Sequence, residues 1–349
     1  LRLVGSEMCI RDRFFTLGGA DANENALKIA RLYTGRNKVF SRYRSYHGST
    51  MGAGNLTGEP RRFNCETNGV SGYIKFFDPY IYREPIEFKS EAEATKYYLA
   101  KLREQIIYEN PETVAAIECE TITGSNGCII PPDGYLQGIR DICDEFGIMM
   151  ICDEVMMGWG RTGEYFAFQN WDVKPDLVSF AKGVTCGYAP LGGVIVSKKI
   201  AEYFDDHKLL CGLTYSGHPL SCAAGVATLD VYKEEKLVEN SKAMGKILGE
   251  ILEELKRKHP CVGDVRYKGL FSALELVKDK ATKEPLVEYN SDPDNTMGKI
   301  IGSLKKKGFS TYSHENCIIV APPLIIKEDE LRAAMDIMDE VLGEVDKMI

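Results

Sequence analysis

The sequence predicts an α/β fold, with a mainly parallel sheet between helices and a smaller α+β domain toward the C-terminus. This prediction rests mainly on three short apolar runs, at residues 114–120, 147–155 and 177–181. Each run is brief and contains Val, Ile, Met or Phe, which favours a buried strand over a helix. Apolar residues at helical spacing follow Tyr135 and Glu328, where we expect amphipathic helices.

The length of 349 residues favours one large and one smaller domain. We expect the large domain to span residues 14–245 and the smaller one residues 246–349. The boundary would then fall inside a long helical pattern that runs from Pro219 to His259. In the smaller domain, the run at 318–323 is expected to form an edge strand or the end of one.

Composition narrows the possible classes of protein. The formal net charge is −8 and no basic block is present, which argues against nucleic acid or an anionic membrane as a partner. No stretch is long and apolar enough to span a bilayer. The 11 cysteines lie singly and the 5 histidines show no metal-ligand spacing. We therefore predict a cytoplasmic protein with buried thiols and no metal site.

Two chemically reactive side chains stand at the ends of predicted strands. Lys182 follows the run at 177–181, and Asp153 lies near the end of the run at 147–155. Open α/β sheets bind ligands outside the carboxyl ends of their strands. A lysine there can attack a cofactor carbonyl, and an aspartate can hold a proton on a pyridine nitrogen; pyridoxal phosphate requires both groups from a protein. A surface lysine at the end of a strand is the alternative.

Several motifs occur together in this region. They are Asp153-Glu-Val155, Gly158-Trp-Gly-Arg-Thr-Gly163, Phe180-Ala-Lys-Gly183 and Tyr188-Ala-Pro-Leu-Gly192. With this combination, the sequence from about Phe14 to the C-terminus resembles the class III (ω-amino acid) aminotransferases, which are pyridoxal-phosphate enzymes of fold type I. The resemblance implies that Lys182 is the nucleophile and proton carrier, and that Asp153 keeps the cofactor ring nitrogen protonated.

A phosphate site is expected near the start of the matched region. The segment Phe14–Arg31 is typical of a strand, a glycine turn and an amphipathic helix, with Asp21 as N-cap and Glu24 completing a capping box. Such a turn presents backbone N–H groups and the positive end of the helix dipole. The resemblance implies that backbone groups of Gly19 and Ala20 bind the cofactor phosphate. An ordinary capped helix is the alternative.

The resemblance also assigns residues around the cofactor ring. It implies that Tyr46 stacks on the pyridine ring, that His47 completes the same motif, and that Val155 packs on the opposite face. Glu120, at the end of its strand, is expected near the cofactor, although its carboxylate could instead cap the following helix or pair with an arginine. For Tyr46, half-buried packing at a strand end is the alternative.

Further residues bear on the partner subunit and on the substrate. Thr214 matches the family threonine that reaches the phosphate of the neighbouring subunit, which implies a homodimer with shared active sites. Trp159 and Tyr312 are expected to line the substrate pocket, although a tryptophan in a glycine-rich loop is as often a structural plug. Tyr312 stands where many family members have an arginine for a substrate carboxylate. Met156 replaces a common glutamine and resembles the subgroup that acts on amines and ω-amino acids.

We therefore expect a transaminase that moves an amino group from an ω-amino acid or amine, such as taurine, to a keto acid such as pyruvate. The motifs look most like the taurine–pyruvate branch of the family. Three alternatives stay open: an aminomutase of the same family, a truncated chain that binds cofactor or partners without turnover, and a nucleotide-binding α/β domain. The last of these would require a Gly-x-Gly-x-x-Gly fingerprint, which Gly18-Gly19 does not provide.

The first residues do not fit this interpretation. Residues 1–13 do not match the family and lack the features of a signal peptide, so we expect non-native sequence joined to a truncated gene. Family members have a segment before the point matched by Phe14, and that segment forms one wall of the active site. We therefore expect the chain as written to be poorly soluble and weakly active or inactive.

Overall fold

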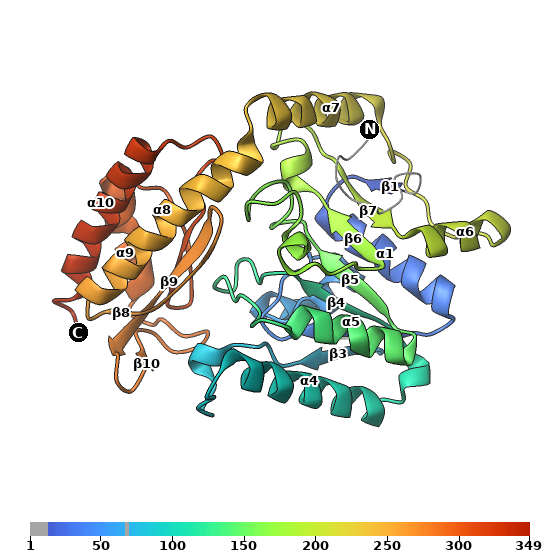
Figure 1. Cartoon of the computed structure of the whole chain (residues 1–349), viewed down its shortest axis with the longest axis horizontal. Coiled ribbons are helices and arrows are strands. Elements are labelled where there is room, and N and C mark those ends of the chain that lie inside the picture. Colours follow the sequence, from blue (N-terminus) through green and yellow to red (C-terminus); the bar gives the residue numbers. More distant parts are fainter. Residues whose placement is uncertain (1–12, 67–69) are drawn as a thin grey trace.

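The computed structural model describes residues 13–66 and 70–349 and contains two sheets (Figure 1). The larger sheet and its helices fill the right-hand part of Figure 1, and the smaller sheet lies at the left with the C-terminal helices. Apart from Arg13, the expected non-native segment lies outside the described residues. The predicted α/β fold with a smaller α+β part is confirmed.

The larger sheet is mainly parallel and has the strand order β1-β7-β6-β5-β4-β2-β3. From β6 through to β3 each neighbouring pair is parallel, and β7 is antiparallel to both β6 and β1. The three predicted apolar runs are β4, β5 and β6, which lie side by side in the sheet. The strands are β1 (Arg13–Thr16), β2 (Lys38–Arg42), β3 (Tyr73–Phe76), β4 (Val114–Glu120), β5 (Met149–Asp153), β6 (Leu177–Phe180) and β7 (Gly192–Val196).

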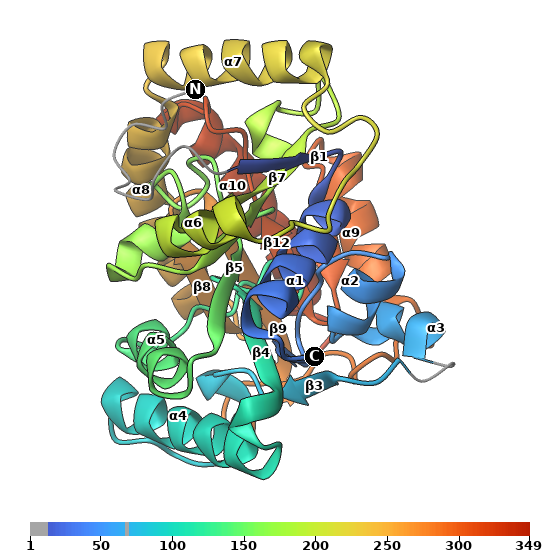
Figure 2. The same cartoon turned by 90° about the vertical axis from the view of Figure 1, so that its right-hand side faces the viewer.

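Helices cover both faces of this sheet. In Figure 2, α1 (Gly19–Thr34) lies on one side of β4 and β5, and α5 (Tyr135–Phe146) lies on the other, next to α4 (Glu91–Tyr108). The remaining helices of this part are α2 (Met51–Leu56), α3 (Phe63–Glu66), α6 (Lys198–Asp206) and α7 (Pro219–Glu234).

The alternation of side chains along the strands decides what faces each helix layer. In β5, Ile151 belongs to the core beneath α1, whereas Cys152 belongs to the core shared with α4 and α5. Glu118 pairs with Ile151, and Glu120 pairs with Asp153. All four side chains therefore lie on the face of the sheet that α1 covers. Several carboxylates are thereby brought onto one face of the sheet, beside α1.

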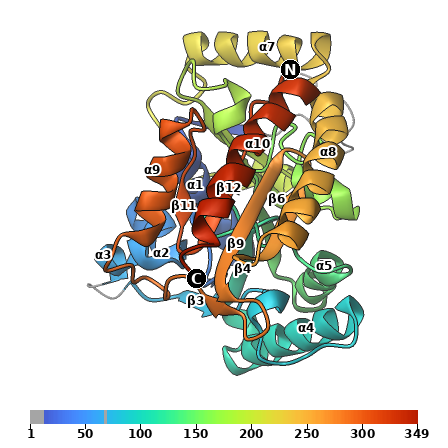
Figure 3. The same cartoon turned by 90° about the vertical axis from the view of Figure 1, so that its left-hand side faces the viewer.

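The smaller sheet is antiparallel, with the order β10-β9-β12-β11 and with β8 also paired to β9. Its buried side chains form a second core with three helices, which lie in front of the sheet in Figure 3. The domain boundary that we expect near residue 245 falls inside the first of these helices and stays a prediction. The elements are α8 (Leu237–Lys258), β8 (Val262–Lys268), β9 (Phe271–Asp279), β10 (Glu284–Pro285), α9 (Thr296–Lys306), β11 (Ser313–His314), β12 (Cys317–Val320) and α10 (Glu328–Val345).

The structure differs from the prediction in one helix and in one strand of the smaller sheet. The helical pattern between Pro219 and His259 is divided into α7 and α8, because Lys236 adopts a φ of +51° between them. The expected edge strand, β12, lies between β9 and β11. The helix predicted from Glu328 is confirmed as α10.

Among the helices of the described ranges, none has the length and apolar character needed to cross a membrane.

Candidate active site

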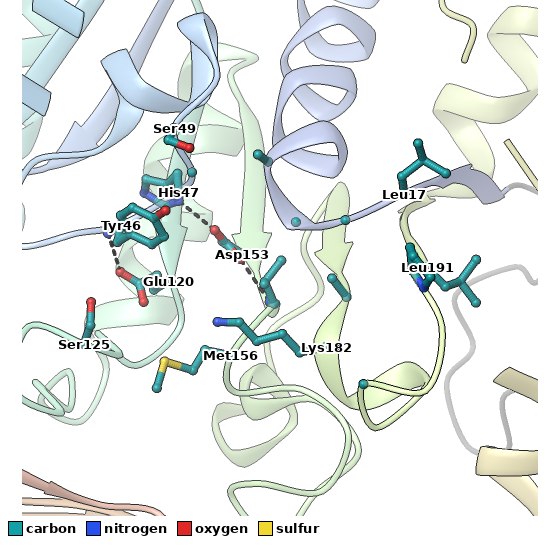
Figure 4. A pocket seen from close by; sticks show the side chains of 18 of the residues that line it. Leu17, Tyr46, His47, Ser49, Glu120, Ser125, Asp153, Met156, Lys182 and Leu191 are labelled. Carbon is teal, nitrogen blue, oxygen red and sulfur yellow. Dashed lines mark hydrogen bonds and ion pairs between the residues drawn. The ribbon is translucent and has the colours of Figure 1, made fainter. Parts of the chain in front are cut away.

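A cavity of about 890 Å³ opens at the carboxyl ends of β4, β5 and β6, beside the N-terminus of α1 (Figure 4). This edge of an open α/β sheet is where ligands usually bind. Apart from Trp159 and Thr214, every predicted site residue lines it, namely Gly19, Ala20, Tyr46, His47, Glu120, Asp153, Val155, Lys182 and Tyr312.

Lys182 reaches the cavity from the turn after β6. The strand ends at Phe180, and Lys182 opens a short 3-10 helix, Lys182–Val184. Its φ of +44° lies in the left-handed region, which a lysine adopts only at a cost in free energy. Figure 4 shows the side chain extended into the cavity, with its amine in the space near Asp153 and Met156. The strained turn therefore directs the amine at the ligand space.

Asp153 is held in the wall of the cavity by three hydrogen-bond partners. One carboxylate oxygen accepts a hydrogen bond from the backbone N–H of Val155 at 3.0 Å. The other accepts a hydrogen bond from Asn23 Nδ2 at 2.8 Å and lies 2.8 Å from His47 Nδ1. Donors of this number and geometry stabilise a carboxylate charge. The residue is therefore suited to face a cationic group of a ligand.

Glu120 fixes the loop that carries Tyr46. Its carboxylate accepts hydrogen bonds from the backbone N–H groups of Tyr46, at 3.0 Å, and of Gly124, at 2.8 Å. These partners lie in loops, so the carboxylate does not act as a cap for the helix that begins at Tyr135. Burial raises the pKa of Glu120 to about 7, although the nearby His47 opposes this shift.

The N-terminus of α1 is open toward the cavity. The helix begins at Gly19, and Gly18 in the N-cap position supplies no side-chain hydrogen bond. The predicted cap at Asp21 is wrong, because Asp21 lies inside the first turn. Glu24 does not close a capping box either, since it accepts a hydrogen bond from the backbone N–H of Gly52 at 2.6 Å. A helix end without a side-chain cap attracts an anion such as a phosphate.

These groups fit pyridoxal phosphate. The cofactor needs an amine for its aldehyde, a carboxylate for its ring nitrogen and an anion site for its phosphate. Lys182, Asp153 and the start of α1 provide these groups around one cavity. The packing is tight at the phosphate end, where a Cβ on Gly19 would lie 2.8 Å from Cγ1 of Val155. The stacking of Tyr46 and Val155 on the ring stays a prediction.

Trp159 does not line this cavity, which corrects the expectation that it contacts substrate. It is 2% exposed, and its ring packs edge-on against Phe166 and Phe180 at centroid distances of 5.3 and 5.6 Å. A Cβ on Gly183 would lie 2.7 Å from the Cβ of Trp159. The tryptophan therefore supports the turn behind Lys182 and is part of the core.

Thr214 also lies outside this cavity, in the exposed segment between α6 and α7. A residue that serves a neighbouring subunit is expected to lie away from the cavity of its own chain. The contact of Thr214 with a partner's cofactor stays a prediction. Tyr312 lines the cavity from the segment before β11, together with His314.

Arg61 is a cavity residue that the sequence did not reveal. It lies in the 3-10 helix Pro60–Arg62, within a stretch rich in Gly, Pro and Arg that shows no periodic pattern. Its guanidinium carbon is 3.6 Å from the ring centroid of Tyr46, and its Nε donates a hydrogen bond to the buried Glu59. One terminal nitrogen lies 3.4 Å from Ser125 Oγ. The cavity thus contains a guanidinium that Tyr46 and Glu59 hold in place.

Comparisons with known proteins agree with this site. The family model for class III aminotransferases matches residues 2–342. A solved structure, the taurine:2-oxoglutarate aminotransferase of Bifidobacterium kashiwanohense in complex with pyridoxal phosphate and glutamate, is 52% identical with a TM-score of 0.94. It covers 97% of this chain, which covers 76% of that one.

Curated relatives act on different amines. The taurine–pyruvate aminotransferase of Bilophila wadsworthia is 34% identical over 96% of this chain and 74% of its own length. The putrescine–pyruvate aminotransferase of Pseudomonas aeruginosa is also 34% identical, over 91% of this chain and 70% of its own length. The family model matches most of this chain, and the geometry of the cavity agrees with that match. This chain therefore belongs to the class III aminotransferases, which are enzymes that use pyridoxal 5'-phosphate.

Proposed function

We propose that this protein transfers an amino group from an amine or ω-amino acid that carries an anionic group, such as taurine, to a keto acid such as pyruvate. The observation that carries this proposal is the presence of Arg61 in the same cavity as Lys182. Taurine has a sulfonate and keto acids have a carboxylate. The guanidinium of Arg61 could bind either of these anionic groups while the amine or keto group lies at Lys182.

The surroundings of Arg61 support an anion-binding role. The ring of Tyr46 and the buried carboxylate of Glu59 hold the guanidinium in place. A guanidinium that is already oriented loses little conformational entropy when it binds a planar or tetrahedral anion. Tyr312, which stands where many family members have an arginine, cannot supply this charge. In this chain the charge comes from another part of the sequence.

The other cavity residues take the following roles in the proposal. Bound pyridoxal phosphate supplies an electron sink for the substrate carbon that loses its proton. Lys182 would hold the cofactor carbonyl, and its amine would move a proton at the substrate carbon as general base and general acid. Asp153 holds the proton on the ring nitrogen. The N–H groups of Gly19 and Ala20 bind the phosphate.

The relatives support the reaction more strongly than they support one substrate. Their names include taurine, putrescine and diaminobutyrate as donors, and pyruvate and 2-oxoglutarate as acceptors. Among these donors, the anionic taurine fits Arg61 best. Dicationic putrescine would place a second positive charge near the guanidinium.

A donor comparison tests the proposal. We expect the cofactor-loaded protein to form alanine from pyruvate, or glutamate from 2-oxoglutarate, faster with taurine than with an arylalkylamine that carries no anionic group. Arg61→Gln should lower kcat/KM for taurine at least about tenfold, a loss of about 1.4 kcal/mol. The same substitution should change kcat/KM for the arylalkylamine little. Arg62→Gln is the matched control, because Arg62 does not line the cavity. Equal losses for both donors would contradict an anion-binding role.

The same assay separates the alternatives. An aminomutase of this family would convert its substrate without an added keto acid, so product formed in the absence of pyruvate and 2-oxoglutarate would favour it. A chain that binds the cofactor without turnover would show the absorbance of bound cofactor but no product with any donor. Strict dependence on a keto acid supports the transaminase.

A further inference from the structure

A buried carboxylate, Glu118, lies beside the pair formed by His47 and Asp153 and has no role in the reaction described above. It is 0% exposed. Neither of its carboxylate oxygens has a hydrogen-bond partner among the described residues. Its Oε1 lies 3.7 Å from His47 Nδ1, which in turn lies 2.8 Å from Asp153 Oδ2.

The position of Glu118 follows from the sheet. Glu118 and Glu120 are two residues apart on β4, so both side chains point to the α1 side. Glu120 lines the cavity, whereas Glu118 does not line it and is buried beside His47. A carboxylate without hydrogen bonds is costly in such a place. Its presence in the centre of the sheet therefore needs a reason other than stability.

The charges around Glu118 are coupled. Burial raises the pKa of Glu118 to about 8, and His47 opposes this shift. Burial alone would lower the pKa of His47, but the hydrogen bond to Asp153 and the charges of Asp153, Glu118 and Glu120 raise it above its usual value. The other charged groups that face Glu118 are Glu24 and Arg31 on α1. Proton uptake at Glu118 and at His47 therefore depends on both groups together.

We propose that Glu118 is a positioning residue that acts through His47 to keep a positive charge beside Asp153 as the pH rises. When Glu118 releases its proton, the new negative charge lies 3.7 Å from His47 and favours the protonated imidazole. The protonated imidazole places a positive charge 2.8 Å from the carboxylate of Asp153, which would hold the proton on the ring nitrogen of the cofactor. The inference concerns this cofactor contact and holds for any amine substrate.

A nuclear magnetic resonance titration of the histidines tests this proposal directly, on the full chain with and without cofactor. The His47 signal is the one that disappears in a His47→Asn protein. Glu118→Gln should lower the pKa of His47 by about one unit or more. Glu118→Leu should give the same shift, so the test does not depend on one variant. Unchanged His47 titration in both variants would overturn the proposal.

A matched control is Glu154→Gln. Glu154 is also a fully buried carboxylate, but it accepts its hydrogen bonds from Thr121 and from the backbone of Ala167 and Phe168. Its replacement should leave the pKa of His47 within experimental error. A shift as large as that of Glu118→Gln would show a general effect of buried charge and would overturn a specific role for Glu118.

The bound cofactor gives an independent measurement. The pH midpoint of its absorbance change should fall in Glu118→Gln, because the loss of a nearby negative charge favours deprotonated forms. The alkaline limb of the kcat profile should move to lower pH by a similar amount, with KM for taurine unchanged. A variant with a lower Tm but unchanged midpoints would show a purely structural role, and the proposal would fail.

Discussion

At the scale of single residues, the first expectation concerns Lys182, whose amine lies in the cavity on a strained turn. Lys182→Ala should abolish turnover, because none of the other lysines in the part of the chain that the structure describes lines the cavity. Some affinity for the cofactor should remain, since the start of α1 still binds the phosphate. Product formation and cofactor retention after gel filtration measure these two effects separately.

The control for this substitution is Lys198→Ala. Lys198 is an exposed lysine at the start of α6 that pairs with Glu202 and lies outside the cavity. Its replacement should leave both turnover and cofactor retention unchanged. A Lys182→Ala protein with a normal rate would show that another group attacks the cofactor.

The protonation of Glu118 predicts a dependence of stability on pH. The folded group keeps its proton up to about pH 8, whereas a glutamate in the unfolded chain loses it near 4.5. Over that window the folded state binds more protons, so this contribution to stability falls as the pH rises. Glu118→Gln removes the contribution. We therefore expect the Tm of the variant, relative to the parent, to rise by a few degrees between about pH 5 and about pH 8.

Thermal unfolding of both proteins across this range checks the prediction. A difference in Tm that does not depend on pH would show that Glu118 does not titrate in the folded protein. The same experiment with Glu154→Gln should show a smaller trend, because the pKa of Glu154 is raised only to about 7.

Some of these residues could be predicted from the sequence and others could not. Lys182 and Asp153 follow short apolar runs, and a strand of this kind ends at the ligand-binding edge of the sheet. Arg61 and Glu118 gave no such signal. Arg61 lies in an irregular loop, and Glu118 interrupts an apolar run whose partners come from distant parts of the chain. Trp159 was misplaced because the sequence does not show which side of a glycine-rich loop faces the core.

At the scale of elements, strands were easier to predict than helix ends. The runs that became β4, β5 and β6 are apolar because both faces of the sheet are covered. The start of α1 was predicted wrongly because Asp21 looks like an N-cap, whereas the structure leaves the cap position to Gly18. The glutamate that seemed to complete the capping box, Glu24, instead binds the start of α2. The departure from the capping rule occurs where a phosphate is expected to bind.

The start of α1 yields a prediction about cofactor affinity. A methyl group on Gly19 would lie 2.8 Å from Val155 Cγ1 and would push that side chain into the ligand space. Gly19→Ala should therefore raise the apparent Kd for pyridoxal phosphate about tenfold, which corresponds to about 1.4 kcal/mol. Gly302→Ala on α9 is the control, because a Cβ there would lie more than 4 Å from the neighbouring atoms of residues 13–66 and 70–349. Equal affinity in the two variants would contradict the assignment of this turn.

At the scale of the whole molecule, buried charges join the two sheets. Glu275 on β9 lies 2.6 Å from Arg266 on β8 and 2.5 Å from Arg83 in the segment between β3 and α4. Arg266 also donates a hydrogen bond to the carbonyl oxygen of Gly127 at 2.8 Å. Burial alone would raise the pKa of Glu275, but the two arginines lower it. Contacts between residues this far apart leave no periodic signal in the sequence, so the way the smaller sheet is fixed could not be predicted.

We expect a homodimer, because large apolar side chains are exposed before β7, between α6 and α7, and at the start of α7. They include Tyr188 at 89%, Leu210 at 71% and Leu220 at 72% exposure. Exposed apolar side chains are stabilised by burial against a partner. Thr214 lies with Leu210 between α6 and α7 and is expected to serve the partner's phosphate site. We therefore predict that dimerisation and cofactor affinity are coupled.

Leu220→Asp tests this coupling, because a charge in a buried interface is costly unless it is paired. We expect sedimentation velocity to show more monomer in the variant, and the apparent Kd for pyridoxal phosphate to rise in parallel. Tyr108→Asp is the control, since Tyr108 is 79% exposed at the end of α4, on another part of the molecule. Thr214→Ala should weaken cofactor binding without changing the dimer. A monomeric Leu220→Asp protein with the parent's cofactor affinity would show that each chain binds its cofactor alone.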